Sequence, residues 1–98
     1  MTEETLETLR REMSTSPSIF AEDLHKAFPG CVNGGPVEFY ASHAAATMHI
    51  ILKPAQDRVI ALIRISTLLV QIHFTTGNNA QRKAMLKRMD NYMQRGGG

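Results

Sequence analysis

Residues 55–76 constrain the fold more than any other part of this chain. Residues 59–74 within that segment form the most apolar run, broken only at scattered polar positions such as Arg64, Gln71 and His73. A membrane-spanning helix needs about 20 mostly apolar residues, so this run is too short and too interrupted to cross a bilayer. We therefore expect it to be a central element of a folded core.

The spacing of its polar residues favours a helix for this segment. Asp57, Arg64 and Gln71 recur every seven residues, which places them on one stripe of a helix. β-Branched residues are abundant, however, and residues 48–52 and 58–65 could instead form a hairpin. A meander of strands would need a turn near Ser66, where no glycine, asparagine or proline is available. We favour the helix and keep the strands as the alternative.

Capping residues and apolar spacing predict further helices in the rest of the chain. Ser16 followed by Pro17 is typical of a helix start, as is Asn78 with Gln81 three positions later. Pro54 should end or kink the helix before it. The predicted helices cover residues 2–13, 17–28, 36–53 and 78–93.

The predicted fold is an all-α bundle of four or five helices that forms a dimer. The alternative is an α+β fold with a three-stranded meander from 45 to 76. The length fits one domain, residues 1–95, followed by a disordered glycine tail at 96–98. For the helical fold we expect these core residues: Leu62, Ile63, Leu69, Val70, Met48, Phe28 and Met89.

Composition indicates a folded cytoplasmic protein. Forty-three per cent of the residues are apolar and 20% are charged, values typical of globular domains. The single cysteine, Cys31, cannot form an internal disulfide, and the acidic start lacks the basic and apolar regions of a signal peptide. We expect a cytoplasmic location and no membrane association.

No pattern of catalytic or metal-binding residues is present. The four histidines (His25, His43, His49 and His73) and Cys31 show none of the short spacings that place two metal ligands together. No serine lies in a nucleophile motif, and the glycine-containing loop 30–36 lacks the lysine and hydroxyl that hold phosphate and magnesium. We expect neither an enzyme nor a bound cofactor.

Two surfaces could bind a partner. The C-terminal helix should carry a basic face that could contact nucleic acid, although alignment with a helix-turn-helix fails. That face consists of Arg82, Lys83, Lys87 and Arg88.

The second surface is the helix predicted at 55–76, which should be apolar over most of its circumference. Such a helix suits either the centre of a monomeric bundle or an interface with a second copy or another protein. The outer positions that we assign to this protein interface are Ile60, Ile65, Leu68 and Ile72.

The arrangement of these segments resembles a known family. The acidic leading segment, the loop Pro-Gly-Cys-Val-Asn-Gly-Gly and the run Arg-Val-Ile-Ala-Leu-Ile-Arg-Ile-Ser-Thr-Leu-Leu-Val-Gln-Ile-His-Phe are similar to those of the QslA-like small quorum-sensing antiactivators of pseudomonads. The similarity spans most of the chain but contains no compact motif, so it assigns no role to an individual residue.

This resemblance implies a helical dimer that binds a LuxR-type transcription factor, disrupts the dimer of that factor and blocks its binding to DNA. The expected function is therefore a non-enzymatic antiactivator of quorum sensing that acts on transcription regulation through protein–protein interaction. The alternative is a nucleic-acid-binding protein that uses the basic C-terminal helix.

Overall fold

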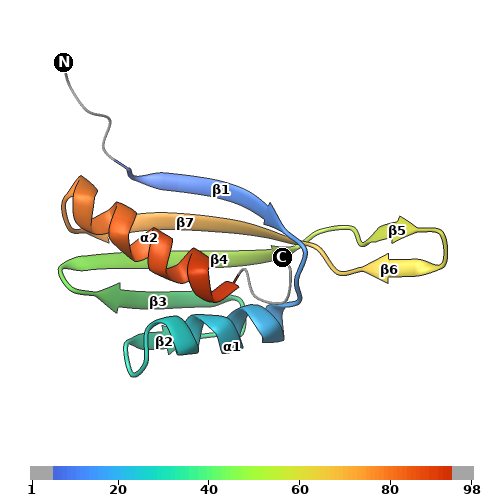
Figure 1. The fold of residues 1–98 in the computed structure, drawn as a ribbon, viewed down its shortest axis with the longest axis horizontal. Helices are drawn as coiled ribbons and strands as arrows, with labels where there is room; N and C mark the ends of the chain where they lie inside the picture. The colour runs from blue at the N-terminus through green and yellow to red at the C-terminus, as the bar shows by residue number, and fades with distance from the viewer. Residues whose placement is uncertain (1–5, 94–98) are drawn as a thin grey trace, which may run out of the picture.

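The protein folds into one antiparallel sheet with two helices on one of its faces. The structure is a computed structural model that describes residues 6–93. Figure 1 shows α1 and α2 lying over the same side of the sheet, with a small hairpin projecting from one end. Five strands of the described chain form the sheet, in the order β1-β7-β4-β3-β2. The elements are β1 (Thr8–Met13), α1 (Pro17–Ala27), β2 (Val32–Gly34), β3 (Glu38–His43), β4 (Ala46–Pro54), β5 (Arg58–Ile60), β6 (Ile63–Ile65), β7 (Leu68–Thr76) and α2 (Asn79–Met93).

The predicted all-α bundle is therefore wrong. Of residues 6–93, 44% lie in strands and 30% in helices, and the class is α+β. The observed sheet also differs from the three-stranded meander of the alternative, because it includes β1, β2 and β3 as well as strands from the later segment.

The two central strands explain why the helix prediction failed. Along β7, buried residues alternate with more exposed ones from Leu68 to Phe74, and β4 shows the same alternation from Ala46 to Leu52. This is the two-residue period of a strand with one covered face. The polar residues spaced seven apart in 55–76 therefore do not form one helical stripe. Asp57 and Arg64 belong to the projecting hairpin segment, and Gln71 lies in β7.

Two of the predicted helices are confirmed, together with their caps. Ser16 caps α1, because its Oγ accepts a hydrogen bond from the Ile19 N–H at 3.3 Å, and Pro17 occupies the first turn. At α2, the Gln81 N–H donates to Asn78 Oδ1 and the Asn78 N–H donates to Gln81 Oε1, both at 2.8 Å. This reciprocal pair is the capping box that the sequence predicted.

The predicted helices at 2–13 and 36–53 are wrong. Residues 8–13 form the edge strand β1, which pairs with β7 from Thr8↔His73 to Met13↔Leu68. Residues 38–54 form the β3–β4 hairpin. The tail predicted at 96–98 and the ends of the predicted domain 1–95 lie outside the described residues.

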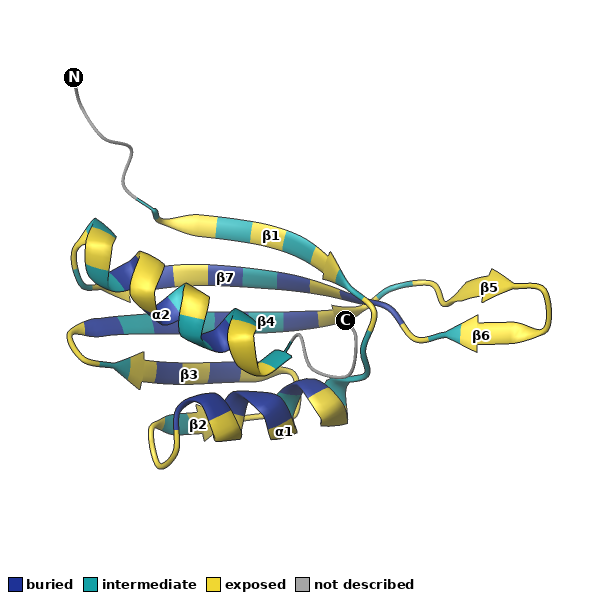
Figure 2. Ribbon diagram, in the orientation of Figure 1, coloured by how far each residue is buried: buried dark blue, intermediate teal, exposed yellow. Residues whose placement is uncertain are grey.

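The core lies between the helices and the covered face of the sheet (Figure 2). Of the predicted core residues, four are buried: Phe28, Met48, Val70 and Met89. The other three are exposed instead: Leu62, Ile63 and Leu69. The helical assignment placed them on the inner face, whereas Leu69 lies on the outer face of β7 and the other two belong to the projecting hairpin.

Two tight turns lack the residues that usually mark them. The β3–β4 turn contains Ala44 at φ +54°, and the β5–β6 turn contains Ala61 at φ +55°. Positive φ is strained for a residue with a Cβ atom, so glycine or asparagine normally occupies such positions. These alanines gave no turn signal, which is why the sequence did not reveal the hairpins.

We predict that Ala44→Gly stabilises the protein by about 0.5–1 kcal/mol. Glycine removes the strain of the left-handed conformation, which exceeds the extra entropy that it gives the unfolded chain. The measurement is the free energy of unfolding in urea. Ala45→Gly is the matched control, because Ala45 does not have positive φ; it should lose about 0.4–1 kcal/mol. If both variants lost the same free energy of unfolding, Ala44 would not be in the strained positive-φ conformation assigned to it.

Candidate functional site

The β5–β6 hairpin projects from the end of the sheet as an extension of β4 and β7. Figure 1 shows it standing clear of the helices and of the other strands. Its base continues the β4–β7 pairing, because the Ala55 N–H donates to the Thr67 carbonyl at 2.9 Å. Arg58 also forms an ion pair with Glu12 of β1 at 3.0 Å. Both side chains of that pair are more than half exposed, so the ion pair contributes little to stability.

The tip of this hairpin is apolar and exposed. Leu62 is 101% exposed, and Val59, Ile60 and Ile63 are 55–64% exposed. Full burial of one large aliphatic side chain stabilises a fold by about 1.5–3 kcal/mol, and none of these residues is buried by the described part of the chain. Large exposed apolar side chains gathered on one projecting element are typical of an interaction site.

The strand register places three isoleucines on one face of the hairpin. Arg58 is opposite Ile65 and Ile60 is opposite Ile63, while Val59 is opposite Arg64. Because side chains alternate along a strand, Ile60, Ile63 and Ile65 share a face, and Val59 and Arg64 lie on the other. We call Val59, Ile60, Leu62, Ile63 and Ile65 the hairpin patch.

The predicted protein interface is divided by the fold. Ile60 and Ile65 lie in the hairpin patch, whereas Leu68 and Ile72 are 1% and 0% exposed beneath the helices. The last two are therefore packing residues of the covered sheet face. The prediction missed Val59, Leu62 and Ile63, although a run of five apolar residues between Arg58 and Arg64 was visible in the sequence.

The second candidate surface is the sheet face opposite the helices, which no described element covers. One row of side chains crosses all five strands there: Thr8, His73, His49, Tyr40 and Asn33. Tyr40 and His49 stack with their ring centroids 4.5 Å apart. On the same face, His49 Nε2 lies 2.8 Å from a Glu38 carboxylate oxygen. His49 and Glu38 thus satisfy each other's polar atoms, as do Thr8 and His73 through their own hydrogen bond.

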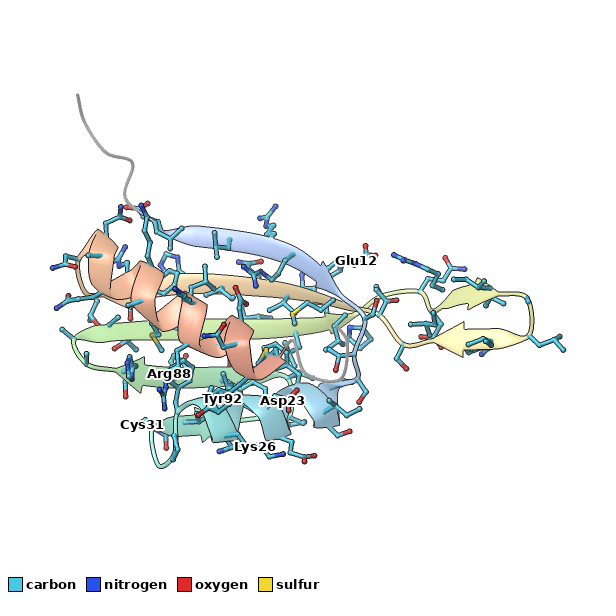
Figure 3. The ribbon with its side chains drawn as sticks, in the orientation of Figure 1. Glu12, Asp23, Lys26, Cys31, Arg88 and Tyr92 are labelled. Carbon is cyan, nitrogen blue, oxygen red and sulfur yellow. The ribbon has the colours of Figure 1, made fainter. Side chains whose placement is uncertain are left out.

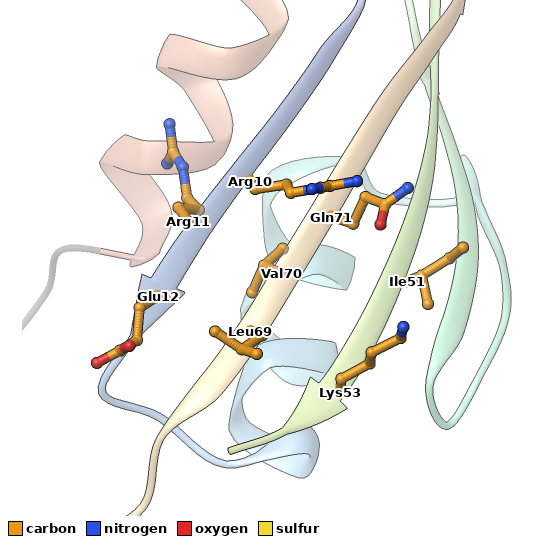
Figure 4. A pocket seen from close by; sticks show the side chains of 8 residues that line it. All are labelled: Arg10, Arg11, Glu12, Ile51, Lys53, Leu69, Val70 and Gln71. Atoms are coloured by element: carbon orange, nitrogen blue, oxygen red, sulfur yellow. The ribbon is translucent and has the colours of Figure 1, made fainter. Parts of the chain in front are cut away.

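A hollow of about 490 Å³ lies beside this row, toward the hairpin end of the sheet (Figure 4). Ile51 and Leu69 form its apolar floor, and Arg10 and Lys53 lie on either side of them. The other lining residues are Arg11, Glu12, Val70 and Gln71.

His49 and His73 are neighbours in the row on the uncovered sheet face, but His43 and Cys31 lie elsewhere. His43 packs against the Phe28 ring at 5.7 Å, His73 contacts the Thr8 hydroxyl at 2.9 Å, and Cys31 is exposed. Within residues 6–93, no group of three or more potential ligands is placed to hold a metal ion.

Two of the four predicted basic-face residues are engaged in the fold. Arg82 is only 9% exposed; its Nη1 donates to the Leu6 carbonyl at 2.7 Å and its Nε to the Thr76 carbonyl at 3.2 Å. Arg88 donates to the Ala27 carbonyl at 2.6 Å, and its guanidinium lies over the Tyr92 ring (Figure 3).

Lys83 and Lys87 are the exposed members of the set. Affinity for nucleic acid depends on the number of phosphates neutralised, so this helix offers a small basic surface.

We predict that Arg82→Met destabilises the protein by about 2–3 kcal/mol, because two part-buried carbonyls lose the charged donor that a buried arginine supplies. Urea unfolding measures this loss. Lys87→Met on the same helix is the control, and its change should stay within about 0.5 kcal/mol because that side chain is exposed. If both variants changed the free energy of unfolding by similar small amounts, Arg82 would be a surface residue. It could then contribute to the predicted basic face.

Comparison with known proteins gives no relative: no family model, no curated protein and no solved structure matches the chain. Neither helix within residues 6–93 has the length and apolar character needed to cross a membrane.

Proposed function

We propose that this protein is a non-enzymatic regulatory domain that binds a protein partner through the hairpin patch. The observation that carries the proposal is the exposure of four large aliphatic side chains at the tip of a projecting hairpin, with Leu62 fully exposed. Hot spots of protein interfaces are side chains that fill a pocket of the partner. Leu62 at the tip is the natural anchor, and the isoleucine face supplies the surrounding apolar contact.

The backbone of the hairpin supports the same function. Within the described chain, β5 and β6 pair only with each other. Each therefore retains an outer edge with unused hydrogen-bonding groups. An extended segment of a partner can add to such an edge, where backbone hydrogen bonds supply affinity and alternate side chains supply specificity.

The proposed partner is a LuxR-type transcription factor, and this choice rests on the family resemblance. An inserted hairpin that covers the surface through which the factor dimerises would block its binding to DNA. For the hairpin to displace one subunit of the factor's dimer, the complex with the hairpin must have the lower free energy. Each tenfold change in the ratio of complex to dimer requires about 1.4 kcal/mol. The helical form of the antiactivator is not part of the proposal, because the fold is α+β.

A homodimer and a cytoplasmic location complete the proposal. Two copies can cover their isoleucine faces by packing hairpin against hairpin in the absence of the partner. A partner that binds the same face would then compete with self-association.

We predict that Leu62→Asp weakens partner binding by about thirtyfold or more, because a buried anchor contributes about 2 kcal/mol or more. Binding is measured by titration of a purified LuxR-type factor, with release of that factor from its DNA as a second readout. The free energy of unfolding should stay within about 0.5 kcal/mol of the original protein, since this side chain makes no core contact.

Ile19→Asp is the matched control for that experiment. Ile19 is also exposed, at 45%, but it lies on α1, and an acidic residue is well tolerated near a helix start. The control should bind normally. If the factor does not bind the unmodified protein, the proposed partner is wrong. If Leu62→Asp and Ile19→Asp behave alike, the hairpin is not the interface.

A further inference from the structure

The hollow on the uncovered sheet face combines an apolar floor with two cationic side chains. Two neighbouring rows of the sheet build it: Arg10, Gln71 and Ile51 in one, and Glu12, Leu69 and Lys53 in the other. Figure 4 shows Arg10 extended over β7 toward Gln71, with Lys53 on the far side of the hollow. The site therefore rests on three adjacent strands of the main sheet, apart from the hairpin patch.

The two cations are available to a ligand. Within residues 6–93, the side chains of Arg10 and Lys53 form no hydrogen bond or ion pair, although both backbones pair in the sheet. The other charged lining residues are already paired, since Arg11 contacts Asp90 and Glu12 contacts Arg58. The hollow thus has two unneutralised positive charges, while its one carboxylate is occupied.

The positions of these cations suit a single anionic group. Arg10 on β1 and Lys53 on β4 are two strands apart across the sheet and two residues apart along it, so their backbones are roughly 12 Å apart. Long arginine and lysine side chains can both reach a group between them, and the amide of Gln71 lies on the same row as Arg10. Arginine is well matched to carboxylate and phosphate oxygens.

The floor of the hollow requires an apolar component as well. Leu69 is 46% exposed and Ile51 is half-buried, so both present aliphatic surface to whatever lies above them. The volume of about 490 Å³ lies within the range of small-molecule sites, roughly 300–1,000 Å³. An inorganic anion alone would leave this apolar surface exposed.

Charge also argues against a second copy of the chain as the occupant. Its most exposed apolar element is the hairpin, which brings Arg64 with it as well as the paired Arg58. Arg64 would approach Arg10 and Lys53 with like charge. The complementary occupant is apolar and anionic.

We infer that this hollow is a binding site for an amphipathic anion, in which an acyl chain lies on Ile51 and Leu69 and an anionic head group lies between Arg10 and Lys53. The same chemistry is offered by a free acyl anion and by an anionic lipid of a bilayer. The site is independent of the proposed hairpin interface.

We predict that dodecanoate, below the concentration at which it forms micelles, binds the full chain in calorimetric titration and that dodecanol binds at least about tenfold more weakly. Arg10→Ala and Lys53→Ala should each weaken dodecanoate binding by about tenfold, because each removes one charge-assisted contact. Leu69→Asp should abolish it by placing a like charge on the floor.

Lys87→Ala is the matched control, because it removes an exposed lysine from α2, on the helix side of the sheet. Its affinity for dodecanoate should be unchanged. The inference is overturned if dodecanoate does not bind, if dodecanol binds equally well, or if Lys87→Ala loses as much affinity as Lys53→Ala.

Vesicles distinguish the two sources of the ligand. Binding of dodecanoate without binding to phosphatidylglycerol vesicles supports a site for a free acyl anion. Binding to both, with the same sensitivity to Arg10→Ala, supports a site that accepts the lipid from a bilayer. Binding to vesicles alone would contradict the hollow as the site.

Discussion

Burial of one face of the β4–β7 pair beneath α1 and α2 is the constraint on which the other features depend. Met48 and Ile50 of β4 and Val70 and Ile72 of β7 are at most 1% exposed, and together they supply much of the aliphatic core under the helices. Because strand side chains alternate, burial of these positions sends their neighbours to the opposite face. His49, Ile51, Gln71 and His73 are therefore placed on the uncovered face by the packing of their chain neighbours on the other face.

The same strand pair positions both candidate surfaces. The chain leaves the sheet at Pro54 and returns at Leu68, so the hairpin between them is directed outward from a rigid base. A tip held in this way loses less conformational freedom on binding than a mobile loop would. The hollow lies at the same end of the sheet, where β1 and β4 present long cationic side chains around the aliphatic side chains of Leu69 and Ile51. Arg82 supports this arrangement from the other side, because it joins α2 to the carbonyls that flank β1 and end β7.

Local signals predicted the two helices well and the sheet poorly. The caps at Ser16 and Asn78 use contacts within four residues, which a sequence displays directly. The strands depend on partners far along the chain: β1 pairs with β7 across about sixty residues, and its own spacing of Leu9 and Met13 fits a helix equally well.

The hairpin turns could not be recognised in the sequence, because Ala44 and Ala61 occupy turn positions that glycine or asparagine normally fills. The candidate site was predicted in part, since Ile60 and Ile65 were chosen as outward-facing, but Leu68 and Ile72 were assigned to the wrong side by the helical period.

The sequence by itself determined the starts of α1 and α2, the apolar character of residues 59–74 and the excess of apolar surface that requires cover. These properties follow from side-chain chemistry and from contacts between near neighbours. Only the tertiary structure decided which of those apolar residues are covered. Leu68 and Ile72 are buried because β7 lies between β1 and β4 under the helices, whereas Leu62 and Ile63 are exposed because the chain runs beyond the sheet before it turns. The physical reason is that the inward face of a strand is set by its pairing register and by the layer packed on it, neither of which a local pattern specifies.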